Sequence, residues 1–375
     1  MAAELGQTRL VSLDVFRGMT IAGMVLVNNP GTWEAIYPPL EHAEWHGLTP
    51  TDLVFPFFLF IVGVSIALAL GQRSEEGAPR EVYLKIFRRS ALIFLIGSLL
   101  HLFPFFDFAN WRIPGVLQRI AVCYLVAALI FLHANWKQLT IISGILLLFY
   151  WLLMTIVPVP GCAVTTIDDK ACNLAAYVDR SVFGLNHIWK QAKVYDPEGL
   201  LSTIPAVVTT IAGILTGLWL RAKRADYEKV AGIFFFGIVL LVVGWLWNPF
   251  FPFNKALWTS SYVVFTAGLA LCFLGFCYWL VDLKGYKAWA KPFVIFGVNA
   301  MALYVGSGLL GRLMGLVKLN GANGEQTDLQ GWIYATVFEP LADPKTASLM
   351  FALSYIGLWL FLMWLLYRKK IYIKV

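Results

Sequence analysis

Two histidines and an aspartate precede an apolar stretch in residues 41–63, EHAEWHGLTPTDLVFPFFLFIVG. Because imidazole titrates near neutral pH, His42 is a candidate general base or acyl-accepting nucleophile, and His46 follows one turn later if this segment is helical. Asp52 comes after a Thr-Pro-Thr pattern, so it is expected to cap a helix, and its carboxylate can also orient a histidine. A solvated histidine and a purely capping aspartate are the alternative interpretations. Two histidines without a third suitably spaced ligand favour acid-base chemistry, and we expect no metal.

A second set of ionisable groups opens the first apolar stretch, SLDVFRG at residues 12–18. Asp14 and Arg17 lie three residues apart, on one face of a helix, where they can form an ion pair. A structural pair and a contact with substrate both fit this spacing. Asn28 follows Arg17 by about 16 Å along a helix, so its carboxamide is expected near the opposite membrane surface.

Polar residues also mark the ends of later apolar stretches. In WRIPGVLQRIAVC, residues 111–123, Gln118 and Arg119 lie a turn or two inside a predicted span. An arginine at that depth needs a partner or an anionic ligand. The segment NPFFPFNKALWTSS and the later GVNAMALY add further candidates: Asn248, Lys255, Trp258 and Asn299. Tryptophans at such positions are mostly interface anchors.

The elements that position these residues must be membrane-spanning helices. Hydrophobic residues make up 59% of the 375 positions and charged residues 14%, and the mean hydropathy is +0.71, which excludes an ordinary soluble domain. Apolar runs of about 20 residues cross the membrane as helices, because lipid offers no partners to open strands. We therefore expect an all-α polytopic membrane protein of one domain, residues 1–375. About ten transmembrane helices are expected, near residues 10–29, 51–71, 86–103, 113–132, 138–157, 201–220, 230–247, 257–281, 292–311 and 346–367.

The formal net charge of +7 lies mostly in alternate loops, which indicates membrane orientation rather than nucleic-acid binding. Lys and Arg gather in the segments 73–89, 221–229, 284–291 and 368–374. The loop 30–50 has none, so both termini are expected to be cytoplasmic and His42 to lie outside. The long outer loop 158–200 contains Cys162 and Cys172, which either form a disulfide in an oxidising compartment, as we expect, or stay unpaired.

Six segments resemble, in this order, the heparan-alpha-glucosaminide N-acetyltransferase family of transmembrane acyltransferases: SLDVFRG, the turn at Asn28, HAEWHGLTPTDLVFPFFLFIVG, RIPGVLQRIA, NKALWTSS and FGVNAMALY. The likeness runs from about Arg9 to the last span. It implies that acetyl from cytosolic acetyl-CoA is placed, across the membrane, on the amino group of a terminal glucosamine. It also implies that His42 is the catalytic histidine and that Asn28 is the asparagine that assists it.

The resemblance and the polar groups together suggest a role for each candidate. Catalysis is expected at His42, Asn28 and Asp52. Acetyl-CoA, as the acyl donor, is expected to contact Asp14, Arg17, Gln118 and Arg119. The acceptor is expected to contact Glu41, Trp45, His46, Asn248, Lys255, Trp258 and Asn299. The carboxylate of Glu41 suits a cationic amino sugar, and it fits a solvated loop charge equally well.

Two other functions fit the same sequence. A sugar or amino-sugar transporter would use the intramembrane charges as a relay for protons or substrate. An O-acyltransferase would acetylate a hydroxyl group of a cell-envelope glycan. We expect a multi-pass protein of the bacterial inner membrane, with the periplasm outside and with acetyl-CoA, an amino-sugar glycan and the lipid bilayer as partners. No nucleic acid is expected, and the family resemblance favours a homodimer.

Overall fold

The computed structural model of the chain describes residues 10–75, 78–320 and 326–373. These residues divide into two compact units. The first unit comprises residues 1–37, 225–234 and 271–374, and the second comprises 38–224 and 235–270. Residues 1–9 and 374–375, which belong to the termini expected in the cytoplasm, lie outside the described residues.

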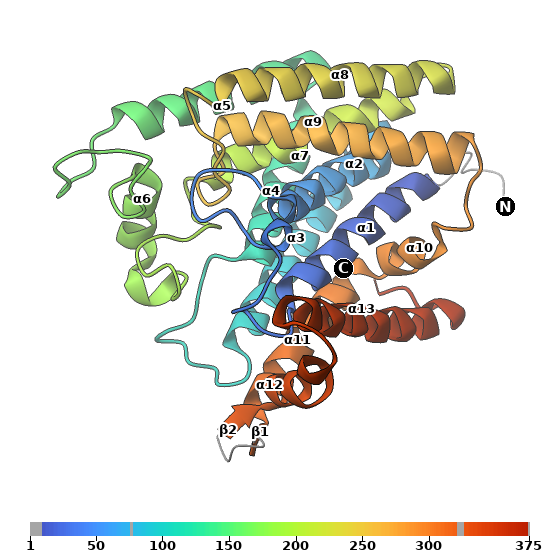
Figure 1. Cartoon of the computed structure of the whole chain (residues 1–375). Coiled ribbons are helices and arrows are strands. Elements are labelled where there is room, and N and C mark those ends of the chain that lie inside the picture. Colours follow the sequence, from blue (N-terminus) through green and yellow to red (C-terminus); the bar gives the residue numbers. More distant parts are fainter. Residues whose placement is uncertain (1–9, 76–77, 321–325, 374–375) are drawn as a thin grey trace. The chain divides into compact units, whose positions relative to one another are not determined.

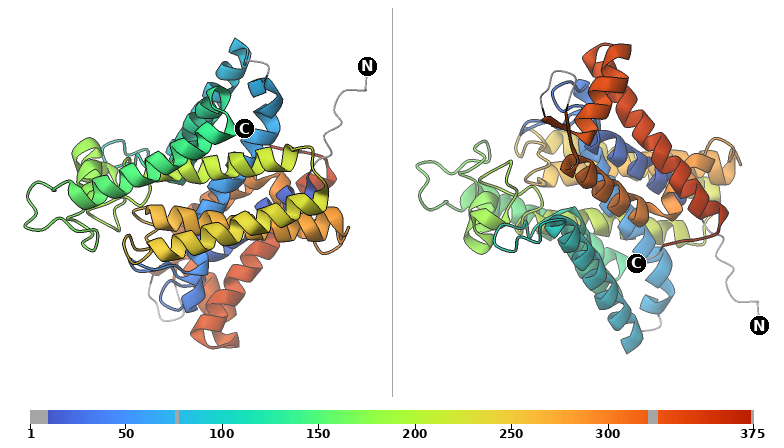
Figure 2. Two further views of the ribbon diagram at one scale, coloured as in Figure 1. Left: turned by 90° about the horizontal axis from the view of Figure 1, so that it is seen from above. Right: turned by 90° about the horizontal axis from the view of Figure 1, so that it is seen from below.

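The second unit consists of helices and short helical turns (Figure 1). Its complete elements are η1 (Pro38–Leu40), η2 (Pro50–Leu53), α2 (Val54–Glu75), α3 (Arg80–Leu102), α4 (Val116–His133), α5 (Trp136–Ile156), α6 (Leu174–Phe183), η3 (Leu185–His187) and α7 (Thr203–Arg221). The greater part of α8 (Asp226–Trp247) and the first part of α9 (Ser260–Cys277) also belong to it. The segment 158–200, which contains α6, lies beyond the carboxyl end of α5 (Figure 2).

The most extensive helix packing in this unit joins α2 to α7. A Cβ atom on Gly63 would lie 1.9 Å from the carbonyl oxygen of Thr210, and one on Gly213 would lie 2.0 Å from that of Phe60. Both positions require glycine, because the two backbones approach as closely as small residues allow in membrane helices. The contact fixes α2, whose start carries the candidate aspartate Asp52.

The first unit begins with α1 (Val11–Asn28) and ends with α13 (Pro344–Arg368). Between them lie a π-helical turn η4 (Tyr278–Leu283), α10 (Lys291–Val298), α11 (Ala300–Leu316), the strands β1 (Lys318–Asn320) and β2 (Gln326–Asp328), α12 (Leu329–Ile333), a second π-helical turn η5 (Tyr334–Phe338) and η6 (Glu339–Leu341). The two strands pair antiparallel. Within the unit, α1 packs most extensively on α10.

The expected span 292–311 is not straight. Its two parts, α10 and α11, meet at an angle of 80°. Asn299 stands at the break with non-helical backbone angles, and its carboxamide donates to the Ile371 carbonyl at 3.1 Å and accepts from the Ile373 N–H at 2.9 Å. A side-chain contact with the end of the chain therefore accompanies the bend.

Each of the ten expected spans falls on a helix or on the bent pair. Within the described residues, eight helices are long and apolar enough to cross a membrane, and the bent pair gives a ninth if it forms one span. The helix α3 is not among them, because Lys85, Arg88 and Arg89 interrupt its apolar run. The all-α polytopic fold expected from the sequence is confirmed.

Replacing Gly63 by valine should destabilise the protein, because the new side chain meets the α7 backbone. Overpacking of this kind costs about 1–3 kcal/mol and sometimes more. Gly144→Val is the matched control, since a Cβ there would meet nothing within 4 Å. The two variants are compared by thermal unfolding in detergent. Equal midpoints would contradict the close approach of α2 and α7.

Candidate functional site

His42 and Asp52 form the central contact of the site. His42 lies in the irregular segment before η2, and Asp52 is the third residue of η2. The Nδ1 atom of His42 lies 2.7 Å from Oδ1 of Asp52. The side chain of Asp52 is 1% exposed and that of His42 is 48% exposed. The pair thus combines a buried carboxylate with an imidazole that is open to a ligand.

The local turn orients Asp52. Thr49 caps η2, and Pro50 is its first residue. Proline suits this position, because a backbone N–H there would have no partner within the helix. Oδ2 of Asp52 accepts hydrogen bonds from the N–H groups of Ala43 and Thr49, both at 3.1 Å, and from the Thr49 hydroxyl at 3.0 Å. Oδ1 is left for His42. Because a carboxylate accepts there, Nδ1 of His42 is the donor and Nε2 is left to accept a proton.

Lys255 reaches the same imidazole from the segment between α8 and α9. Its Nζ atom lies 3.2 Å from each ring nitrogen of His42 and 3.8 Å from Oδ1 of Asp52. The Gly47 N–H donates to the Phe253 carbonyl at 2.8 Å and so ties this segment to the histidine segment. Burial lowers the pKa of Lys255, while the nearby carboxylates act in the opposite direction. The structure therefore brings a lysine, a histidine and an aspartate together.

A disulfide closes the loop 162–172 beside the histidine segment. Nε1 of Trp45 donates to the Ile167 carbonyl at 2.8 Å, and Nε2 of His46 lies 2.9 Å from Oδ1 of Asp168. The loop thus holds the chain three to four residues beyond His42. In the parts of the chain that the structure describes, no group of three His, Cys, Asp or Glu side chains is placed to hold a metal ion.

Three further predicted acceptor residues differ in their exposure. Trp258 is fully buried, and its Nε1 donates to the Thr209 hydroxyl at 3.1 Å. Asn248 accepts from the Phe253 N–H at 2.8 Å through Oδ1. Glu41 is exposed. Trp258 and Asn248 therefore use polar atoms for bonds within the fold, whereas Glu41 is accessible to a ligand.

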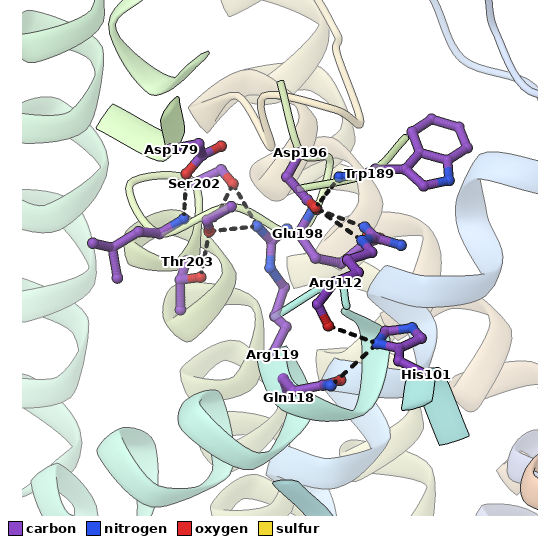
Figure 3. A network of polar contacts seen from close by, with 12 residues as sticks. His101, Arg112, Gln118, Arg119, Asp179, Trp189, Asp196, Glu198, Ser202 and Thr203 are labelled. Atoms are coloured by element: carbon purple, nitrogen blue, oxygen red, sulfur yellow. Dashed lines mark hydrogen bonds and ion pairs between the residues drawn. The ribbon is translucent and has the colours of Figure 1, made fainter. Parts of the chain in front are cut away.

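An ionic cluster lies in the same unit (Figure 3). Arg112 donates from Nε and Nη2 to the two carboxylate oxygens of Asp196 at 2.8 and 2.5 Å, and from Nη2 to Glu198. The N–H of Trp189 also donates to Asp196, at 2.9 Å. Burial disfavours the charge of Arg112, but the two carboxylates outweigh burial and hold its pKa above the usual value. The cluster is thus a well-paired buried charge system.

Arg119 on α4 is 2% exposed. Its Nη2 donates to the Gly199 carbonyl at 2.9 Å and to the Ser202 hydroxyl, and its guanidinium carbon lies 5.2 Å from the centre of a Trp258 ring. Nε and Nη1 have no hydrogen-bond partner among the residues that the structure describes. Gln118, the preceding residue, is buried as well. Unpaired buried donors are unfavourable, so these two donors distinguish Arg119 from the well-paired Arg112.

Four of the sequence candidates belong to the other unit: Asp14, Arg17, Asn28 and Asn299. Nη1 of Arg17 lies 3.0 Å from Oδ1 of Asp14, which is the ion pair that their spacing allows. Asn28 is the last residue of α1 and is exposed. Asn299 already uses both groups of its carboxamide at the bend. The contacts of these residues with substrate stay predictions.

The sequence candidates did not include the acidic partners of this site. Asp196 and Glu198 neutralise Arg112, and Asp168 contacts His46. A signal for the first two was present, because Arg112 is the one cation in the loop 104–112 and a partly buried arginine needs an acidic partner. The sequence does not say which of the acidic residues that partner is.

Comparison with known proteins supports the motif resemblance. Residues 9–223 match the family model described as "Heparan-alpha-glucosaminide N-acetyltransferase, catalytic". The chain is 30% identical over 423 residues to heparan-alpha-glucosaminide N-acetyltransferase of Homo sapiens, and 29% identical over 424 residues to that of Mus musculus. Both alignments cover 98% of this chain and 60% of the relative. The chain thus spans less than two thirds of the length of these curated relatives.

The buried carboxyl of Asp179 on α6 should make stability depend on pH. Burial raises its pKa to about 7. The folded chain therefore binds a proton that the unfolded chain releases near pH 4, so stability falls as pH rises from about 4 to 7 and then levels off. Asp179→Asn keeps an acceptor for the Leu200 N–H, which now donates to Oδ1 at 2.8 Å. At pH 8 this variant should be more stable than the wild type, on the order of 2 kcal/mol.

Denaturant unfolding of the wild type and the variant at pH 5 and pH 8 measures this difference. Glu44→Gln is the control, since Glu44 is exposed and its replacement should leave the pH dependence unchanged. A gap between the wild type and Asp179→Asn that does not grow with pH would contradict the role of the buried carboxyl.

Opening the disulfide should loosen the histidine segment. Replacing Cys162 and Cys172 by serine frees the loop that bonds Trp45 and His46, so the amides of residues 42–47 should exchange with deuterium several-fold faster. Mass spectrometry of that peptide measures the exchange. Reductant should have the same effect on the wild type and none on the double variant. Unchanged exchange after both treatments would show that the loop does not hold the segment.

Proposed function

Because the chain belongs to the heparan-alpha-glucosaminide N-acetyltransferase catalytic family, we propose that it is a membrane-embedded N-acetyltransferase. In this proposal it transfers acetyl from acetyl-CoA to the amino group of glucosamine or of a glucosamine-ended glycan. The observation that carries the proposal is the contact of a half-exposed imidazole, His42, with the buried carboxylate of Asp52. A base oriented in this way is what an amine acceptor requires.

The chemistry follows from the protonation of the acceptor. A glucosamine amine arrives as ammonium and cannot attack until it loses a proton. Nε2 of His42 accepts that proton, and the neutral amine then attacks the thioester carbonyl carbon. The carbon–sulfur bond breaks, and the thiolate of CoA takes up the second proton that the nitrogen loses, so the products are the amide and free CoA. In the alternative route, His42 accepts the acetyl group first and passes it to the amine. Both routes need the same imidazole in the same place.

The oxyanion formed in either route needs a hydrogen-bond donor. The carboxamide of Asn28 is proposed for this role on the strength of the family resemblance, and one such donor contributes about 3 kcal/mol. For the acyl donor, the two free guanidinium donors of Arg119 suit the oxygens of an acyl-CoA, with Gln118 beside them. The Asp14–Arg17 pair is proposed to contact the same molecule. For the acceptor, the proposal assigns direct contact to Glu41 and Trp45, and supporting roles to Trp258 and Asn248, whose polar atoms bond within the fold.

The sidedness of the reaction is part of the proposal. Lys and Arg are abundant in alternate loops and absent from the loop 30–50, which favours cytoplasmic termini and an outer location for His42. Disulfides form in oxidising compartments, and the disulfide-closed loop 162–172 bonds Trp45 and His46. Both observations support a periplasmic acceptor and a cytoplasmic acetyl-CoA, with the protein in the inner membrane of a bacterium.

The direct test is acetyl transfer by the purified protein and three variants. The wild type should release CoA and form N-acetylglucosamine from acetyl-CoA and glucosamine, with both products measured by mass spectrometry. His42→Gln should lower the rate by about 10²–10⁴-fold because the base is lost, and Asp52→Asn by a comparable factor because the imidazole loses its orientation. His133→Gln is the control, since His133 contacts Tyr83 and should stay fully active.

The other outcomes separate the rival functions. Full activity of His42→Gln would keep the enzyme and remove the histidine from the mechanism. CoA release with N-acetylglucosamine, which offers hydroxyl groups but no amine, would indicate an O-acyltransferase. Uptake of glucosamine into proteoliposomes, with no CoA released from acetyl-CoA whichever acceptor is added, would indicate a transporter and contradict the proposal.

A further inference from the structure

The ammonium of Lys255 occupies an unusual place beside His42. Its Nζ atom is equally far from Nδ1 and Nε2, 3.2 Å from each. The lone pair of an imidazole nitrogen points outward in the ring plane, away from the other nitrogen. An atom equally close to both nitrogens at this distance therefore lies to one side of the ring plane. Lys255 thus acts on the ring mainly through its charge.

The charges around the imidazole oppose one another. The Asp52 carboxylate lies 2.7 Å from Nδ1 and favours a protonated ring. The Lys255 ammonium disfavours it, because two positive charges would then lie in contact. On the same segment as His42, Glu41 and Glu44 are exposed to solvent, where screening weakens their effect.

Two charged groups act on Lys255 itself. Glu198 favours its charge and Arg119 disfavours it. Burial lowers the pKa of Lys255, and Asp52 works against that effect. The side chain is 21% exposed, so the ammonium is only partly screened by water. The geometry is therefore that of a cation placed beside both the Asp52 carboxylate and the His42 ring.

We propose that Lys255 acts through His42, offsetting the Asp52 carboxylate so that the imidazole stays unprotonated at the pH of the reaction. The catalytic use of this effect rests on the proposed function, since a base must be free to take the proton of the acceptor ammonium. The charge relation, which is the effect of the Lys255 charge on the protonation of His42, rests on the contacts alone. Lys255 is thus a positioning residue: it acts on the protonation of His42 and does not contact the acceptor.

The test follows the protonation of His42 directly. Protein with isotope-labelled histidine is titrated by NMR, and the His42 signal is identified by its loss in His42→Gln. In Lys255→Met and Lys255→Gln, His42 should hold its proton to a pH about one unit higher than in the wild type. Lys255→Arg keeps the charge and should leave the titration in place. Lys190→Met is the matched control, because Lys190 is an exposed lysine of the same unit.

The acidic limb of the pH–rate profile provides the second readout. It should move to higher pH by the same amount in the two neutral variants. An unchanged His42 titration in both neutral variants would overturn the inference, and so would a loss of activity at every pH. If the wild type transfers no acetyl, a shifted His42 titration in the two neutral variants would uphold the charge relation and reject the proposed function.

Discussion

The Asp52 carboxylate is the group on which the rest of the site depends, because it joins separate stretches of chain at one buried point. Oδ2 accepts from Ala43 and Thr49, and Oδ1 faces His42 and Lys255. A buried carboxylate is very unfavourable unless donors surround it. The same bonds that make its burial tolerable therefore also start the helix, fold the preceding segment and orient the imidazole. In addition, the hydroxyl of Tyr262 on α9 donates to the Asp52 carbonyl at 2.6 Å, so the start of α2 is fixed from another helix.

The cluster around Arg112 extends this charge system within the same unit. Burial alone would raise the pKa of Glu198, but Arg112, Arg119 and Lys255 outweigh it and hold that pKa below the usual value. Glu198 therefore connects the two groups of charges electrostatically. Arg112 secures its place with two bonds to Asp196 and one to Glu198. Removing one member of such a system leaves another buried charge unpaired, which is why its members serve the fold as well as the site.

Local rules could predict the features that depend on neighbours in the sequence. The apolar runs predicted the helices, and the three-residue spacing predicted the Asp14–Arg17 ion pair. The Thr-Pro-Thr pattern predicted the capped turn at Asp52. The same rules could not find the bend at Asn299, because its carboxamide bonds a segment more than seventy residues away. Nor could they name the partners of Arg112, which lie 84 and 86 residues further along the chain. In both cases the chemistry of the residue was visible, but its partner was not.

The sequence by itself determined that the chain spans a membrane as helices, since composition and the length of apolar runs leave no other way to satisfy the backbone in lipid. It also determined the family, through the types and order of its motif residues, and it pointed to His42 and Asp52 as candidates for catalysis. Only the tertiary structure decided that Asp52 contacts His42 while His46 faces Asp168. It also decided that Lys255, 213 residues further along the chain, lies beside the His42 ring. The physical reason is that hydrogen bonds and close charge contacts act over about 3–4 Å. Which groups come that close is set by the packing of helices distant in sequence.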